Sequence, residues 1–329
     1  MTALSVLDLA PVVEGGSACQ ALANSLDLAR QAERLGYKRY WVAEHHNMRG
    51  IASSATAVVI GHVAGGTKSI RVGAGGIMLP NHAPLMVAEQ FGTLAALYPG
   101  RIDLGLGRAP GTDGLTAQAL RRTLRSDPNK FPQDVVELRD YFKPYETGQR
   151  VCAVPGNGED VPIYILGSSL FGAQLAALLG MPFAFASHFA PAAMMQAIEI
   201  YRDNFEPSEQ LDRPYVMLGF NICAAETEEQ ANYLRTSSLQ ALINLRLGTP
   251  GPLPPPVAGF EKTLDAQQQI ILSQVSSASA VGTADQVREQ VEAFIAQTGA
   301  DELVIVGQIF DHAERIRSYE IAMEACKGL

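Results

Sequence analysis

The feature of this 329-residue chain that most restricts its fold is an alternation of short apolar runs with helical patterns. Each apolar run has the length of a buried strand, and the segment after it repeats apolar residues at the three- and four-residue spacing of a helix face. Eight such β-then-α units predict a single-domain (β/α)8 barrel over residues 1–329. The predicted strands are residues 4–9, 37–43, 69–79, 102–106, 161–166, 183–186, 215–224 and 303–306.

An open, doubly wound sheet is the main alternative to a barrel. Such a sheet requires a glycine-rich nucleotide fingerprint after its first strand. Here Leu9 runs into APVVEGG, which is not GxGxxG. The sequence therefore favours the closed barrel.

Two insertions interrupt the alternation. Residues 107–130, after the fourth strand, read as irregular and polar, which is long for a compact domain without a functional reason. Residues 248–259, GTPGPLPPPVAG, follow the helix of the seventh strand and are rich in proline and glycine. We expect this second insertion to lie outside the barrel and to fold over its mouth.

Composition excludes several classes of partner and compartment. With 25 Lys and Arg against 34 Asp and Glu, the formal charge is −9, and there is no basic run. We therefore expect neither nucleic acid nor an anionic membrane as a partner. No run reaches the ~18 apolar residues of a spanning helix, the N-terminus lacks the pattern of a signal peptide, and the cysteines lack metal or redox spacing. These features predict a cytoplasmic protein.

The second predicted strand ends in three ionisable residues, Glu44, His45 and His46. In a parallel barrel the carboxyl ends of the strands carry the chemistry. Adjacent residues of a strand point to opposite sides, so only one of the two imidazoles can face the mouth. HExxH is absent, and we expect no metal site. A histidine that is merely hydrogen-bonded at a strand end is the structural alternative.

Other strand ends carry the features of a phosphate seat and a flat shelf. Gly75 and Gly76 close the third strand, where a bulge or the close approach of a planar ligand would require glycine. Gly167, Ser168 and Ser169 begin a helix, whose N–H groups and dipole suit a phosphate, although an ordinary helix cap reads the same way. Arg108 would add a fixed charge, with a surface arginine as the alternative. Together these groups suit flavin mononucleotide (FMN).

At these same residues the chain resembles the bacterial luciferase-like family of flavin-dependent monooxygenases. The resemblance spans nearly the whole chain in family order, through residues 41–47, 72–84, 88–111, 165–189 and 281–291.

The resemblance implies a barrel that takes reduced FMN from a separate flavin reductase and uses O2, through a C4a-hydroperoxide, to oxygenate a small organic substrate. By match, His45 is the acid/base histidine, with Glu44 facing away or turning in to orient it. Gly75 and Gly76 match a pair joined by a non-proline cis peptide beside the flavin ring. Arg108 and the Ser168–Ser169 loop match the phosphate contacts, and the helices after strands two and three suggest a homodimer.

Two departures and two alternatives accompany this resemblance. Gly167 and Ser168 stand where the luciferases carry glutamate and serine, and a second phosphate arginine is absent near residues 130–131. One alternative is a deazaflavin-dependent oxidoreductase on the same barrel, for which Arg108, Arg121, Arg122 and Arg125 form the only basic cluster near the mouth. The other is a flavin-binding homologue without catalysis, which would lack the imidazole that His45 supplies here.

Overall fold

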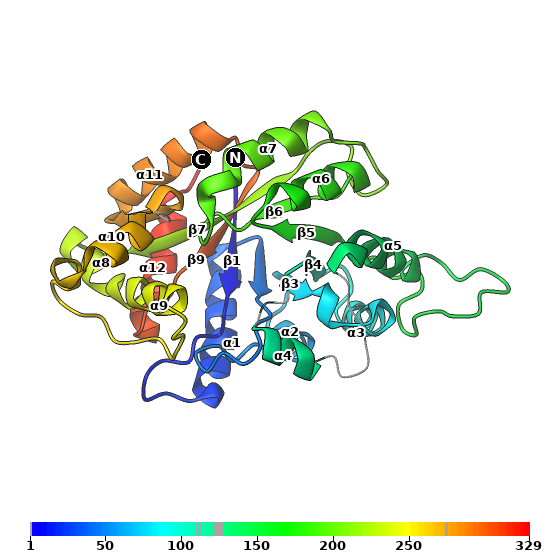
Figure 1. Cartoon of the computed structure of the whole chain (residues 1–329), viewed down its shortest axis with the longest axis horizontal. Coiled ribbons are helices and arrows are strands. Elements are labelled where there is room, and N and C mark those ends of the chain that lie inside the picture. The colour runs from blue at the N-terminus through cyan, green and yellow to red at the C-terminus, as the bar shows by residue number, and fades with distance from the viewer. Residues whose placement is uncertain (1, 110, 112, 121–127, 274–275) are drawn as a thin grey trace.

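Eight parallel strands form a closed barrel in the computed structural model, which describes residues 2–109, 111, 113–120, 128–273 and 276–329. The strands pair in chain order from β1 to β7, and β9 closes the barrel between β7 and β1. The predicted (β/α)8 barrel is therefore confirmed, with helices arranged around the sheet (Figure 1). The barrel strands are β1 (Ala3–Asp8), β2 (Arg39–Val42), β3 (Arg71–Met78), β4 (Ile102–Gly107), β5 (Ile163–Gly167), β6 (Phe183–Phe185), β7 (Val216–Ala224) and β9 (Glu302–Val306).

Some helices begin and end at residues that satisfy their terminal backbone groups. Ser17 accepts a hydrogen bond from the Gln20 backbone at the start of the first helix, and Gly36 ends it in the left-handed region. Thr283 and Gln286, three residues apart, have the sequence pattern of a capping box, and the structure contains it at the start of the helix. The helices are α1 (Ala18–Leu35), α2 (Thr56–Gly66), α3 (Pro84–Leu97), α4 (Gly114–Leu120), α5 (Phe131–Tyr141), α6 (Leu170–Leu179), α7 (Met194–Asp203), α8 (Glu228–Leu234), α9 (Thr236–Arg246), α10 (Ala266–Ser273), α11 (Ala284–Thr298) and α12 (His312–Ala325).

A ninth strand, β8 (Ser279–Gly282), lies outside the barrel and differs from the expected strand pattern. The long strand β7 pairs with β9 along Met217–Asn221 and with β8 along Asn221–Ala224. Because β8 has only four residues, its local apolar pattern is too short to stand out from the surrounding loop.

Three sequence-based assignments need correction. The segment 107–130 is not wholly irregular, because it contains α4 and a short 3-10 helix, η2 (Pro128–Lys130). The apolar spacing over 227–245 predicts one helix, but the structure divides it at Arg235 into α8 and α9. The sequence over 247–280 reads as a loop, but the structure has α10 and the 3-10 helices η4 (Phe260–Thr263) and η5 (Ser276–Ala278) there.

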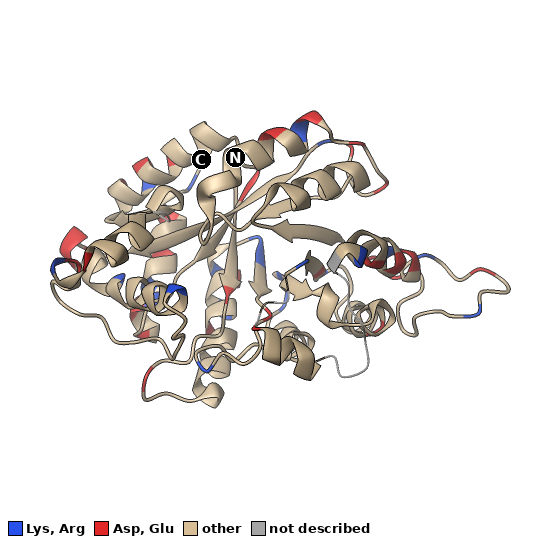
Figure 2. Ribbon diagram, in the orientation of Figure 1, with Lys and Arg blue, Asp and Glu red and all other residues tan. Residues whose placement is uncertain are grey.

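The barrel is filled by side chains and has a layered core. Alternate residues of each strand point inward or toward the helices, so Trp41 lies inside the barrel while its neighbours Tyr40 and Val42 pack under the helices. Charged side chains lie mostly on the outer helices and loops (Figure 2). In the part of the chain that the structure describes, no helix is both long and apolar enough to cross a membrane.

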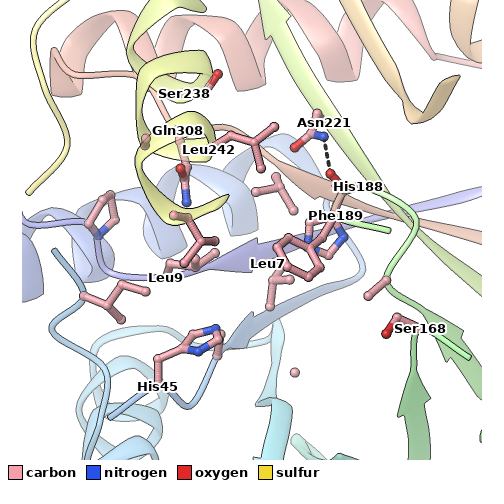
Figure 3. Close-up of a pocket in the computed structure, with 18 of the residues that line it drawn as sticks. Leu7, Leu9, His45, Ser168, His188, Phe189, Asn221, Ser238, Leu242 and Gln308 are labelled. Carbon is pink, nitrogen blue, oxygen red and sulfur yellow. Dashed lines mark hydrogen bonds between the residues drawn. The ribbon is translucent and has the colours of Figure 1, made fainter. Parts of the chain in front are cut away.

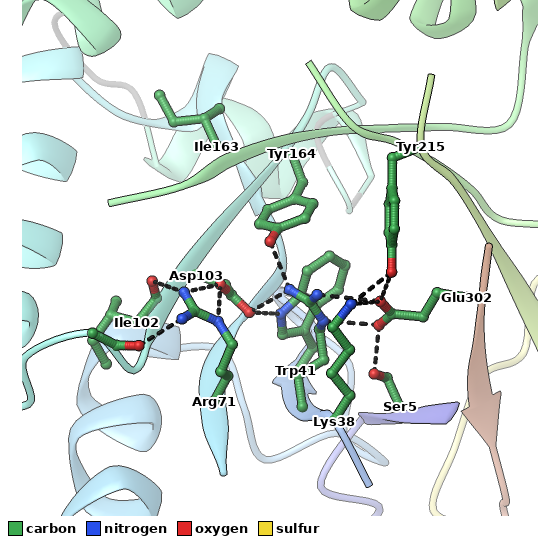
Figure 4. Close-up of polar contacts among 12 residues, drawn as sticks. Ser5, Lys38, Trp41, Arg71, Ile102, Asp103, Ile163, Tyr164, Tyr215 and Glu302 are labelled. Carbon is green, nitrogen blue, oxygen red and sulfur yellow. Dashed lines mark hydrogen bonds and ion pairs between the residues drawn. The ribbon is translucent and has the colours of Figure 1, made fainter. Parts of the chain in front are cut away.

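An ion-pair network closes the end of the barrel where the strands begin. Arg39 donates to Asp103 at 2.8 Å, to the Tyr164 hydroxyl at 2.7 Å and to Glu302 at 3.2 Å (Figure 4). Both carboxylates are buried, and Arg71 and Lys38 reach them from the rim. Burial lowers the pKa of Arg39, but Glu302 and Asp103 raise it above the ordinary value overall, so the guanidinium stays charged.

Candidate functional site

A cavity of about 990 Å³ opens at the carboxyl ends of the strands (Figure 3). Its volume lies at the upper end of the range for ligand pockets. Each barrel strand, or the loop after it, contributes to the lining, together with α9 and the segment before η4. Of the predicted site residues, His45 lines the cavity, and so do Gly75, Gly76, Arg108, Gly167, Ser168 and Ser169.

His45 lines the cavity as a half-buried imidazole. Its Nδ1 lies 3.3 Å from the backbone carbonyl of Gly111, which can only accept a hydrogen bond. The proton therefore resides on Nδ1, and Nε2 is left as an acceptor. Burial lowers the pKa of His45, against smaller opposing contributions from Gly111 and Glu44, so the ring is neutral near pH 7.

Serine hydroxyls after β2 hold this strand end in place. Ser53 donates to the carbonyl of Ala43 at 2.6 Å, and Ser54 donates to the carbonyl of His45 at 2.7 Å. In the sequence, Ser53 or Ser54 also has the position of a cap for the following helix. That prediction is wrong, because Ala55 precedes α2 without a side-chain cap. The two serines instead position the backbone on both sides of Glu44.

Glu44 points away from His45 and into a cluster with His46 and His82. Its buried carboxylate accepts from His46 Nε2 at 2.7 Å, from His82 Nε2 at 2.9 Å and from the Met78 backbone at 3.0 Å. Burial raises the pKa of Glu44, but the hydrogen bonds from these groups lower it overall. Of the two orientations expected for Glu44, the structure has the one that faces away from the cavity, and His82 gains a contact that the sequence did not suggest.

The same three side chains bear on the expectation that there is no metal site. The carboxylate of Glu44 and ring nitrogens of His46 and His82 lie within 4.8 Å of one another, a spacing that a metal ion would also allow. Direct hydrogen bonds already account for their arrangement. The absence of a metal stays a prediction.

Gly75 and Gly76 are joined by a non-proline cis peptide, as the resemblance implied. Both line the cavity, and the register between β3 and β4 shifts between Ala74 and Ile77. A Cβ on Gly76 would lie 2.6 Å from the carbonyl oxygen of Gly105, so a side chain there would collide with β4. The Gly75–Gly76 pair therefore forms both the β-bulge and the glycine-lined surface, or shelf, of the cavity.

The residues predicted to bind a phosphate lie together at the start of α6. Ser169 precedes α6 in an extended conformation and makes no side-chain cap hydrogen bond, so the first-turn N–H groups lack a hydroxyl partner from it. The guanidinium of Arg108 lies 4.1 Å above the ring centroid of Phe171, which holds the charge beside this helix start. Helix dipole, backbone donors and a fixed cation converge here.

His188 follows β6 and lines the cavity. The sequence places it at the end of the sixth predicted strand but assigns it no specific role. Its Nδ1 is buried without a hydrogen-bond partner among the described residues, and it packs on Gly219 of β7. Burial, followed by the charge of His45, lowers the pKa of His188 to about 4. The position of His188 after a predicted strand was the signal available in the sequence. Only the structure shows that the ring packs on Gly219 of β7.

The proline-rich segment 248–259 lies at the mouth, as expected, but it is not free of the core. Leu253 is buried, and its backbone pairs with the loop after β1 through bonds from Leu253 to Val12 (2.8 Å) and from Glu14 to Leu253 (2.9 Å). Pro250 and Gly251 line the cavity with it. The composition of the segment predicts almost no side chain suited to a core, and Leu253 is the buried exception.

Fold and site together define a class, the (β/α)8 proteins whose strand ends surround a cavity lined by a helix start, a glycine pair and imidazoles. Residues 2–302 match the family model for luciferase-like monooxygenases, and the chain belongs to this family. It is 53% identical over 327 residues to a luciferase-like monooxygenase of Escherichia coli K12, covering 99% of this chain and 98% of that protein. It is 54% identical to the uncharacterized protein YvbT of Bacillus subtilis, covering 99% and 97%.

Solved structures agree with this membership. Apo-MsnO8 superposes with a TM-score of 0.92 at 36% identity, covering 99% of this chain and 98% of the other. The oxygenating constituent of 3,6-diketocamphane monooxygenase from Pseudomonas putida, in complex with FMN, has a TM-score of 0.74 at 20% identity and coverage of 100% and 99%. An F420-dependent secondary alcohol dehydrogenase has a TM-score of 0.71 at 15% identity and coverage of 99% and 99%. The last two likenesses show the fold alone.

Proposed function

We propose that this protein is an FMN-dependent monooxygenase that oxygenates a small organic substrate with O2. The observation that carries the proposal is the convergence of the phosphate seat at Arg108 and Ser169, the Gly75–Gly76 shelf and His45 in one cavity of about 990 Å³. That volume has room for a flavin and a second, smaller molecule. The N-terminal end of α6 would hold the phosphate, and the shelf would lie against the ring.

Reduced FMN would supply the electrons that activate O2. The residues of the chain bind it, exclude water and handle a proton. His45 is suited to accept or give that proton, because its neutral ring presents Nε2 while the Gly111 carbonyl holds Nδ1–H. The cavity wall excludes water through α9 and Leu253. Since the sequence lacks a nicotinamide fingerprint, a separate flavin reductase would provide the reduced cofactor.

A deazaflavin-dependent oxidoreductase is the second candidate, since the F420-dependent alcohol dehydrogenase shares the fold. Its support would come from the basic cluster, but Arg121, Arg122 and Arg125 lie outside the described residues. The third candidate, a flavin-binding protein without catalysis, is disfavoured by His45 in the cavity. Titration of the apo-protein with FMN and with the deazaflavin separates the first two, and tighter binding of the deazaflavin would overturn our proposal.

Replacing Arg108 with Ala is expected to lower FMN affinity about 10- to 150-fold. A charge-assisted hydrogen bond to a phosphate contributes about 1.5–3 kcal/mol, and the variant loses that partner. Flavin fluorescence titration measures the change. Arg246→Ala is the matched control, because Arg246 also stacks on an aromatic ring, that of Phe189, but lies away from the helix start. Equal affinities of the two variants would remove Arg108 from the phosphate seat.

A homodimer is expected, packed through the helices after β2 and β3. Three large apolar side chains are exposed on this side, Val58 of α2 (73%) and Met86 and Leu97 of α3 (58% and 63%). Light scattering at micromolar concentration should report twice the 35.2 kDa mass of one chain. Val58→Glu combined with Met86→Glu should shift the mass to that of a monomer. A monomer in the parent protein would contradict the proposal.

Truncating Leu253, the buried side chain of segment 248–259, should uncouple O2 consumption from oxygenation of the substrate. Leu253→Ala opens the wall of the cavity, so water reaches the reaction site more easily. We expect FMN affinity within a few-fold of the parent and more hydrogen peroxide released per O2 consumed. Val257→Ala, exposed in the same segment, is the control. If both variants release as much peroxide as the parent, the segment does not shield the site.

A further inference from the structure

We propose that His188 is a second ligand-contacting imidazole of the cavity, which donates a hydrogen bond from Nε2–H to a carbonyl oxygen bound opposite His45. This inference rests on the proposed function, since the carbonyl belongs either to the flavin ring or to the organic substrate. It adds a hydrogen-bond donor to a site in which the sequence suggested only one imidazole.

The surroundings of Nδ1 determine where the proton of His188 lies. A Cβ built on Gly219 would be 2.0 Å from this nitrogen, so the ring edge packs directly on the backbone of β7. Nδ1 has no hydrogen-bond partner among the described residues and is shielded from solvent. A buried N–H without an acceptor is rarer and costlier than a buried lone pair. The neutral ring therefore carries its proton on Nε2.

The ring of His188 lines the cavity (Figure 3). Because Nδ1 is buried against β7, Nε2 is the ring nitrogen left to contact a ligand. Two side chains hold the segment in this position. Ser187 donates its hydroxyl to the Gly219 carbonyl at 2.7 Å, and Asn221 donates to the His188 carbonyl at 2.7 Å. Both contacts tie the segment to β7, so the imidazole is oriented before any ligand binds.

The two cavity imidazoles are chemically complementary. His45 is protonated on Nδ1 by its bond to Gly111 and presents an acceptor, whereas His188 presents a donor. Burial favours the neutral form of both rings, and the charge that His45 would carry further lowers the pKa of His188. A donor that stays neutral can polarise a carbonyl without adding a charge to the cavity.

The first test uses the apo-protein and ¹⁵N-labelled histidine. Long-range ¹H–¹⁵N spectra should show His188 as the Nε2–H tautomer and neutral from pH 8 down to pH 5. The Nδ1–H tautomer, or titration of His188 near pH 6.5, would overturn the proposal. This measurement stands even if FMN proves not to be the cofactor, so the two failures are distinguishable.

The second test identifies the acceptor. Oxidised FMN is added first, followed by 2-heptanone as a carbonyl probe or heptane as the matched hydrocarbon. A shift of the His188 Nε2 resonance on FMN addition assigns the flavin carbonyl, and a shift with the ketone but not with heptane assigns the substrate. No shift with either carbonyl overturns the proposal.

Two substitutions test which ring nitrogen acts. Glutamine has a longer side chain than asparagine, so His188→Gln places an amide N–H near the position of Nε2, whereas His188→Asn places one near Nδ1. We expect the affinity for FMN or for 2-heptanone, whichever shifted the resonance, to stay within about threefold in His188→Gln and to fall about 5- to 150-fold in His188→Asn. Circular dichroism confirms that both variants are folded. Equal affinities in the two folded variants would contradict a donor at Nε2.

Discussion

His45→Ala is expected to lower turnover about 10²- to 10⁴-fold while FMN affinity stays within a few-fold of the parent. General acid–base catalysis by a positioned side chain contributes a factor of this size. The phosphate seat lies at the start of α6 and is untouched by the change. Stopped-flow turnover and flavin titration measure the two quantities separately.

His46→Ala is the matched control, because His46 neighbours His45 but hydrogen-bonds to Glu44. It should lose far less turnover than His45→Ala. If the two variants are equally active, or if His46→Ala is the inactive one, the assignment of His45 is wrong.

The pH dependence of kcat/KM should also reveal the role of His45. Burial lowers the pKa of His45 below its ordinary value of 6.5. The neutral ring, which presents the acceptor Nε2, is thus retained as pH falls through 6.5 and is lost only at a lower pH. We expect the acid limb of kcat/KM to lie below pH 6.5 and to be absent from His45→Ala. An acid limb at or above pH 6.5 in the parent would contradict this expectation.

Arg39→Met should lower the free energy of unfolding by about 3–5 kcal/mol. The substitution keeps much of the side-chain volume but removes the buried cation between Asp103 and Glu302. The two buried carboxylates then keep only the ion pairs with the rim residues Arg71 and Lys38. Urea titration followed by circular dichroism measures the loss. FMN affinity should change little in the folded fraction, because the network lies at the opposite end of the barrel from the cavity.

The control for this prediction is Arg34→Met. Arg34 also pairs with a carboxylate, that of Glu320, but its side chain is 59% exposed. An exposed ion pair contributes about 0–1 kcal/mol, so this variant should be nearly as stable as the parent. Equal losses in the two variants would mean that the charge network is not what stabilises the closed end.

The sequence by itself determined the barrel and the strand ends that carry chemistry. Strand and helix periodicity is a local property, and parallel strands must present their carboxyl ends at one mouth. The cavity therefore contains His45 and Arg108, which follow their expected strands, and the Gly75–Gly76 pair within the third strand. The sequence did not predict strand β8, because four residues are too few to show the two-residue period of a strand.

Tertiary structure alone decided which groups meet. Glu44 contacts His82, which is 38 residues away in the chain, and His188 packs on Gly219 of the next strand. Leu253 is buried against the loop after β1, more than 200 residues earlier. No local pattern encodes such pairs, because the tilt of each strand and the packing of each loop depend on the whole closed barrel. For the same physical reason, the tautomers of His45 and His188 follow from Gly111 and Gly219 and not from their own neighbours in the sequence.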